Sequence, residues 1–157
     1  MLELDTPADF LAHVGTDLGT SDWFTIEQRH ITAFAELTGD DFWIHVDTAR
    51  AARAMPGGTT IAHGLFVLAL VPLLQRQIFR IRQRGKGLNY GSDRVRYLSP
   101  VPAGTRVRLR QHLKQAERRV SDDGGSGTRI TTVCTFDLEG QTKPAVVAEF
   151  ILLIQDA

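Results

Sequence analysis

The run at residues 61–74 constrains the fold of this chain more than any other stretch. His63 is its only ionisable residue. Its apolar residues occupy every face of a helix rather than one stripe with a period of about 3.6 residues, so we predict a central helix that is buried all round. The run is too short to span a bilayer, which takes about 20 apolar residues.

The residues around this run predict where the central helix begins, bends and ends. Residues 58–60 supply turn and capping chemistry, and residues 75–83 continue the helix with one polar face. Pro72 removes a backbone hydrogen bond and clashes with the preceding turn, so we expect a bend there. His63 and Gly64 stand at the helix N-terminus, where free N–H groups and the positive end of the dipole meet. We therefore expect the chemistry at this end.

The second half of the chain predicts a sheet that can cover such a helix. Val107 and Leu109 alternate with arginines and so face one side of a strand. Short turns, including a flexible loop at 121–127, favour an antiparallel meander. One long helix against a curved antiparallel sheet is the hot-dog arrangement, an α+β fold. The expected strands are residues 88–97, 105–118, 129–138 and 145–154.

The first half predicts short elements. Residues 1–21 read as a helical lead-in that starts at Thr6-Pro7. Gly39 is placed to end a helix, and Asp47 to cap the next one. The expected elements are a strand at 22–26 and helices at 27–38 and 48–55. No internal repeat or linker is visible, so we expect one domain over residues 1–157.

Composition limits the class of protein. Eighteen basic and eighteen acidic residues give a net charge of zero, which offers no electrostatic argument for a nucleic-acid or membrane partner. The single cysteine, Cys134, excludes an internal disulfide and reads as a packed thiol. The first residues lack the basic and apolar regions of a secretory signal. These observations predict a cytoplasmic protein.

Two motifs together resemble those of the MaoC-like hydratase family. The first is the segment at residues 34–47, in which an aspartate, Asp40, lies five positions before His45. The second is Ile61-Ala62-His63-Gly64 at the start of the central helix. The Trp-Ile-His-Val-Asp run at 43–47 and the later stretch at 88–102 are similar to the branch that includes nodulation protein N.

The resemblance implies hydration of a trans-2-enoyl-CoA to the (R)-3-hydroxyacyl-CoA, or the reverse dehydration. Such a reaction needs a base for the water, an acid for the α-carbon, and stabilisation of the enolate oxygen. Carried over, Asp40 is the principal acid/base and His45 holds the water. By the same resemblance, the Gly64 N–H is expected to point at the thioester oxygen. The resemblance also implies a homodimer, and no cofactor beyond the coenzyme A of the substrate.

Further residues are candidates for substrate binding. Phe42 and Trp43 stand in the motif where the family commonly has asparagine and proline, so they are expected to reshape the acyl pocket. His63 is a candidate by its position, although we expect its ring to pack and hydrogen-bond internally. Asn89 and Arg94 are candidates in the second half. Arg94 and Arg96 are candidates to bind the phosphates of coenzyme A. The basic residues at 76–86 either bind these phosphates or complement the helix dipole.

Other interpretations of the same residues remain open at this stage. Asp40 follows a helix-ending glycine and so can be a turn residue, and His45 can be a half-buried histidine bonded to a carbonyl. Asp40, His45 and His63 form a formal set for iron, but no metal-ligand spacing supports it and we predict no metal. The rival functions are an acyl-CoA thioesterase and a non-catalytic acyl-CoA-binding subunit.

Overall fold

The centre of the protein is an antiparallel six-stranded sheet in the order β2-β6-β7-β8-β5, with β3 also paired to β6. The computed structural model describes residues 1–120 and 124–157. The strands are β2 (Asp17–Thr20), β3 (Phe24–Thr25), β5 (Gly87–Tyr97), β6 (Arg106–Val120), β7 (Ser126–Leu138) and β8 (Val146–Gln155). The strands predicted for the second half are therefore present.

Alternation of buried and exposed side chains explains why these segments form strands, whereas their order in the sheet differs from the predicted one. Burial alternates along β7 and β8, because every second side chain points into the core. Val107, Leu109 and Phe136 are among the fully buried residues. Strands β6, β7 and β8 form the predicted meander, but β5 pairs with β8 and not with β6. The long-range pairing puts β5 at an edge of the sheet.

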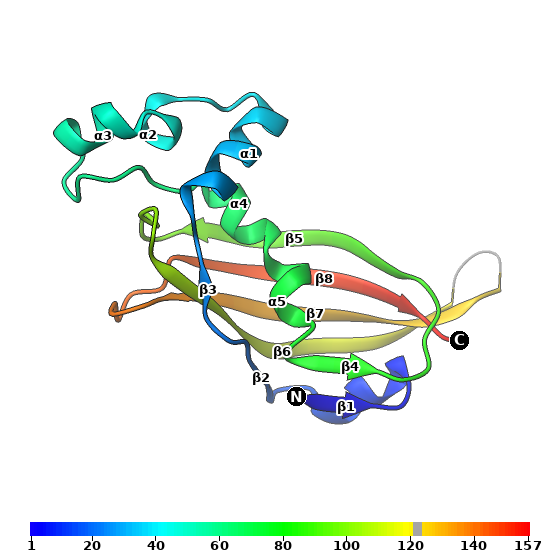
Figure 1. Ribbon diagram of the computed structural model, residues 1–157. Helices are drawn as coiled ribbons and strands as arrows, with labels where there is room; N and C mark the ends of the chain where they lie inside the picture. Colours follow the sequence, from blue (N-terminus) through cyan, green and yellow to red (C-terminus); the bar gives the residue numbers. More distant parts are fainter. Residues whose placement is uncertain (121–123) are drawn as a thin grey trace.

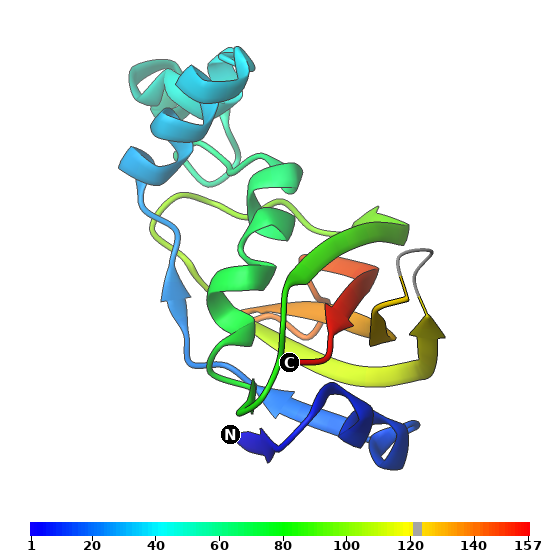
Figure 2. The ribbon, with the colours of Figure 1, turned by 90° about the vertical axis from the view of Figure 1, so that its right-hand side faces the viewer.

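Two short helices, α4 (Gly64–Ala69) and α5 (Val71–Gln75), form the central helical element. They run across one face of the sheet (Figure 1), and the sheet curves around them (Figure 2). The helix breaks at Leu70, and Pro72 stands in the first turn of α5, which agrees with the predicted bend. The prediction that the helix continues to residue 83 was wrong. The chain instead enters β4 (Phe79–Ile81), which pairs in parallel with β1 (Leu2–Leu4).

The prediction that the central helix is buried all round was also wrong. Val67, Val71 and Leu74 are buried, whereas Leu65 is 63% and Leu73 45% exposed. The sheet covers these helices on one side (Figure 2), so residues on the other side keep part of their surface.

The segment that carries the first motif lies beyond one end of the sheet (Figure 1). It contains α1 (Gln28–Thr38), α2 (Trp43–Val46) and α3 (Thr48–Ala54). Gly39 ends α1 with a left-handed φ of 76°, which a glycine adopts without steric cost. The Asp47 carboxylate accepts a hydrogen bond from the Arg50 N–H at the start of α3. Both predicted helix boundaries are confirmed.

The N-terminal lead-in was predicted only in part, because a helix does begin at Thr6-Pro7 but strands flank it on both sides. Residues 1–21 form β1, a 3-10 helix η1 (Pro7–His13) and β2, in place of one helical segment. The strand predicted at 22–26 is reduced to the two residues of β3. In the predicted loop at 121–127, Ser126 and Gly127 belong to β7, and residues 121–123 lie outside the described part. No described helix is long and apolar enough to cross a membrane.

Candidate active site

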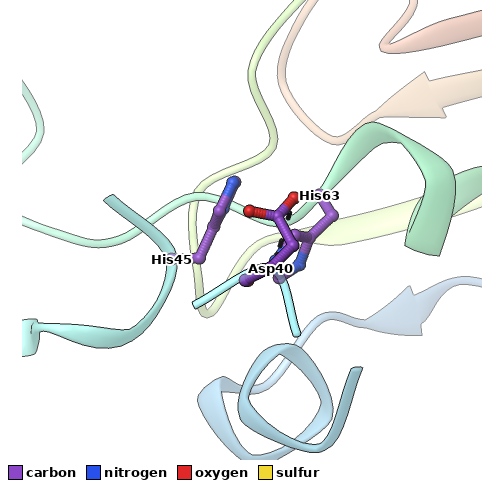
Figure 3. A group of neighbouring side chains, drawn as sticks. All are labelled: Asp40, His45 and His63. Atoms are coloured by element: carbon purple, nitrogen blue, oxygen red, sulfur yellow. Dashed lines mark hydrogen bonds and ion pairs between the residues drawn. The ribbon is translucent and has the colours of Figure 1, made fainter. Parts of the chain in front are cut away.

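Asp40, His45 and His63 come together from three consecutive parts of the chain. Asp40 lies in the loop after α1, His45 in α2, and His63 directly before α4 (Figure 3). One nitrogen or oxygen atom from each lies within 4.8 Å of the corresponding atoms of the other two. The structure thus joins the two sequence motifs in one cluster. It also brings together the three residues of the formal iron set, for which the sequence spacing gave no support.

His45 is held by its backbone-facing nitrogen. The residue is 9% exposed, and its Nδ1 lies 2.7 Å from the carbonyl oxygen of Ile61. A carbonyl only accepts hydrogen bonds, so Nδ1 carries a hydrogen, and in the neutral ring Nε2 is then the nitrogen with the lone pair. The carbonyl-bonded interpretation of His45 is therefore correct, and it leaves Nε2 available to a water molecule.

His63 is buried and makes the internal contacts expected of it. It is 3% exposed, and its Nε2 lies 2.8 Å from the main-chain carbonyl oxygen of Asp40. Its ring stacks on the ring of His45, with 3.7 Å between centroids and an interplanar angle of 25°. The ring of Phe34 packs at 5.0 Å from that of His63. These contacts fix the orientation of both imidazoles.

The Asp40 carboxylate is the accessible member of the cluster. Its side chain is 59% exposed, and its Oδ2 lies 3.9 Å from Nε2 of His63. The left-handed turn at Gly39 directs the chain from α1 toward the two histidines. Asp41 is exposed, and it makes no hydrogen bond or ion pair to any residue that the structure describes. The two neighbouring aspartates therefore differ in their surroundings.

A largely apolar pocket of about 270 Å³ opens beside this cluster. Its walls come from α4, from the end of β5 and the turn after it, and from the start of β8. The lining includes His45, Gly64, Val67, Tyr97, Ala145 and Val146. Tyr97 and the residues of β8 were not predicted as site residues, because strand pairing brings them here from distant parts of the chain.

Gly64 packs tightly against Tyr97. A Cβ atom at Gly64 would lie 2.5 Å from Cδ1 of the tyrosine ring, a separation that real side chains do not adopt. Gly64 is also the first residue of α4, so its N–H has no acceptor within the helix. Burial raises the pKa of the Tyr97 phenol. Glycine at this position thus lets the Tyr97 ring pack against the start of α4, beside a backbone donor that has no acceptor within the helix.

Replacement of Gly64 by alanine is expected to displace the Tyr97 ring and deform the pocket. We expect a fall in kcat/KM of about 100-fold, because small misplacements at a reacting centre have effects of that size. Steady-state kinetics with an enoyl thioester, the substrate that the resemblance of the sequence motifs implies, measure it. The control is Gly64→Ala combined with Tyr97→Ala, which removes the ring. An unchanged rate in the single variant would contradict the predicted displacement.

The other predicted binding residues lie outside the lining of this pocket. Phe42 is 58% exposed and packs on Trp43, whose ring lies 4.1 Å from the Arg50 guanidinium carbon. Asn89 lines a separate groove with Arg76, Arg80 and Arg84. Arg94 is exposed on β5, and its Nε lies 3.6 Å from Oε1 of Glu149. Cys134 is buried, as expected, and burial raises its thiol pKa.

Comparison with known proteins agrees with the two motifs. A family model described as "MaoC like domain" matches residues 9–133. The 3-hydroxyacyl-thioester dehydratase Z of Mycobacterium tuberculosis is 46% identical over 97% of both chains. Nodulation protein N of Rhizobium leguminosarum is 41% identical over 94% of this chain and 90% of its own. The resemblance to the nodulation protein N branch is therefore confirmed.

Solved structures share the fold at low sequence identity. The R-hydratase PhaJ1 of Pseudomonas aeruginosa superposes with a TM-score of 0.72 at 19% identity, over 92% of this chain and 83% of that one. The (R)-hydratase of A. caviae gives a TM-score of 0.62 at 22% identity, over 88% and 94%. With the sheet curved around its central helices, this chain has the hot-dog fold and belongs to the MaoC-like dehydratase family.

Proposed function

We propose that this protein catalyses the hydration of a trans-2-enoyl-CoA to the (R)-3-hydroxyacyl-CoA, and the reverse dehydration. The observation that carries the proposal is the convergence of Asp40 and His45 beside a pocket lined by Gly64. A relative 46% identical over nearly its full length bears the name of a 3-hydroxyacyl-thioester dehydratase, which supports this class of reaction.

Each group has a role that follows from its surroundings. Nε2 of His45 accepts a hydrogen bond from a water molecule, because Nδ1 is already donating to Ile61. The Asp40 carboxylate takes a proton from that water as its oxygen bonds to C3, and returns the proton to C2. The negative charge that forms on the thioester oxygen meets the Gly64 N–H, and one such donor contributes about 3–4 kcal/mol to lowering a barrier.

A single assay separates this function from its rivals. Purified protein is incubated with crotonyl-CoA, while enoyl absorbance and free thiol are both recorded. Loss of enoyl absorbance with the thioester intact supports the proposal, and chiral analysis of the product tests the (R) configuration. Release of free thiol identifies a thioesterase instead. Neither change, with acyl-CoA still bound, identifies a binding subunit.

The edge strand β5 supports a homodimer. It pairs with β8 on one side and with no described strand on the other. Leu88, Tyr90 and Tyr97 on this strand are 51%, 62% and 49% exposed. A long edge with exposed apolar side chains is a site for strand pairing, and two copies related by a two-fold axis pair antiparallel there.

Light scattering measures the mass of the protein in solution and so tests for this dimer. A Tyr90→Lys variant is expected to be monomeric.

Such a dimer brings a basic groove next to the active site of the other protomer. The groove has a volume of about 740 Å³ and contains Gly87 and Asn89 at the start of β5, whereas Tyr97 at its end lines the catalytic pocket. Antiparallel pairing sets the start of one β5 against the end of the other. Arg76, Arg80 and Arg84 line the groove, and they make no ion pair within the described residues. They are suited to the phosphates of coenzyme A.

Replacement of Arg76, Arg80 and Arg84 by alanine is expected to raise KM for crotonyl-CoA by about tenfold for each arginine that binds a phosphate. The N-acetylcysteamine thioester has no phosphates, so its KM should stay unchanged. Arg82→Ala is the matched control, because Arg82 pairs with Glu3 and Asp5 outside the groove. Equal effects on both substrates would contradict the assignment.

Mixed dimers test whether the groove serves the other protomer. One chain carries Asp40→Asn and its partner carries the three arginine substitutions. If the groove acts across the interface, one complete site remains and KM for crotonyl-CoA is normal. If it acts within one chain, no complete site remains.

We expect one domain over residues 1–157, located in the cytoplasm, that needs no metal or cofactor.

A further inference from the structure

The two histidines of the site are anchored reciprocally. His45, in the segment that follows Asp40, bonds to the carbonyl of Ile61. His63, in the segment that follows Ile61, bonds to the carbonyl of Asp40. A backbone hydrogen bond of 3.0 Å from the Ile61 N–H to the Ile44 carbonyl joins the same two segments. The stacked imidazoles therefore brace the first motif against the start of α4.

The bond from His63 fixes its tautomer. Because the Asp40 carbonyl accepts the bond, Nε2 of His63 carries the hydrogen. Its Nδ1 is buried and has no hydrogen-bond partner in the part of the chain that the structure describes. Burial of an unpaired acceptor is unfavourable, and phenylalanine would fill the same space without it. The Nε2–H bond to Asp40 is the compensating interaction that the histidine supplies and phenylalanine does not.

Few other contacts hold Asp40. It lies in a loop without regular structure, its side chain is 59% exposed, and its own N–H makes a long bond of 3.4 Å to Oγ1 of Thr38. Of the hydrogen bonds described for the main chain of Asp40, the bond from His63 is the shorter, at 2.8 Å. The position of the catalytic carboxylate thus depends on an imidazole that itself is buried away from substrate.

We propose that His63 is a positioning residue: its Nε2–H holds the main chain of Asp40 so that the carboxylate faces the water on His45. The proposal rests on the hydratase function proposed above. It gives His63 a role other than that of a substrate-binding candidate, because the ring is 3% exposed and lies outside the pocket lining.

Two substitutions separate the hydrogen bond from the ring. His63→Phe keeps an aromatic ring stacked on His45 but has no donor. His63→Gln places an amide N–H the same number of bonds from Cα as Nε2, and so restores the donor without the ring. We expect kcat of the Phe variant to fall about 100-fold with KM nearly unchanged, since the carboxylate is misplaced while the pocket remains. The Gln variant should recover most of kcat.

Equal losses in the two variants, or full activity in the Phe variant, would overturn the proposal. Melting temperatures are recorded for both, so that a folding defect is not mistaken for misplacement. Nitrogen-15 NMR of the imidazoles in the wild-type protein gives a readout independent of activity. We expect His63 as the Nε2–H tautomer and His45 as the Nδ1–H tautomer. An Nδ1–H tautomer at His63 would overturn the proposal even if the protein hydrates no thioester.

Discussion

An Asp40→Asn variant is expected to lose about 10²–10⁴-fold in kcat for enoyl-CoA hydration, the usual contribution of a positioned acid/base group. The amide has nearly the shape of the carboxylate but neither takes up nor returns a proton. The side chain is 59% exposed, so the substitution should leave the melting temperature close to that of the wild type. Initial rates with crotonyl-CoA measure the effect.

Asp41→Asn is the matched control for this variant. It is adjacent, makes the same change in charge, and removes no contact to a described residue. We expect it to retain most of the wild-type activity. An inactive Asp41 variant beside an active Asp40 variant would show that the catalytic carboxylate had been assigned to the wrong residue.

A His45→Asn variant is expected to be inactivated to a similar degree, by about 10²–10⁴-fold in kcat. The asparagine amide nitrogen lies as many bonds from Cα as Nδ1, so it can still donate to the carbonyl of Ile61. Only the function proposed for Nε2, to hold the water, is removed. The variant should therefore fold normally, as thermal melting can verify, and fail in the hydration assay.

The same substitution at His30 serves as the control for His45. Nδ1 of His30 also bonds a backbone group, accepting the Glu27 N–H at 3.2 Å, but the residue belongs to α1 and lies outside the pocket lining. His30→Asn is expected to remain active. If His45→Asn were active as well, the water would have to be held by another group.

Local signals in the sequence predicted the elements with a strong period. Helix α1 and its end at Gly39 follow from helical spacing and from the left-handed turn that a glycine permits. Strands β6, β7 and β8 follow from alternation of apolar residues. In each case the residues that determine the element lie within it, so one stretch of sequence contains the information.

Elements that depend on distant partners were not predicted. Strand β1 pairs with β4, far away along the chain, and neither strand is long enough to show a period. The polar stretch after Gln75 was interpreted as a solvent-facing helix, because the pattern does not reveal that Phe79–Ile81 will pair with the N-terminus. Exposure of Leu65 and Leu73 depends on which faces the sheet covers, which composition does not specify.

The residues of the candidate site likewise include some that local motifs predicted and others that depend on distant parts of the chain. The motifs predicted Asp40, His45 and Gly64, and the structure places them together. Tyr97 was missed as a site residue, because its contact with Gly64 arises from the pairing of β5 with β8 and the curvature of the sheet. The bond from His63 to Asp40 joins residues from two separate motifs, and no spacing within either one reveals it.

Tyr97 connects the exposed strand β5 to the proposed active site. Its ring covers Gly64 at one end of a strand whose outer edge is available to a second chain. Thioester binding and self-association should therefore be thermodynamically linked, so that each changes the affinity of the other by the same factor. Dilution below the dissociation constant should then reduce specific activity, and saturating substrate should restore it.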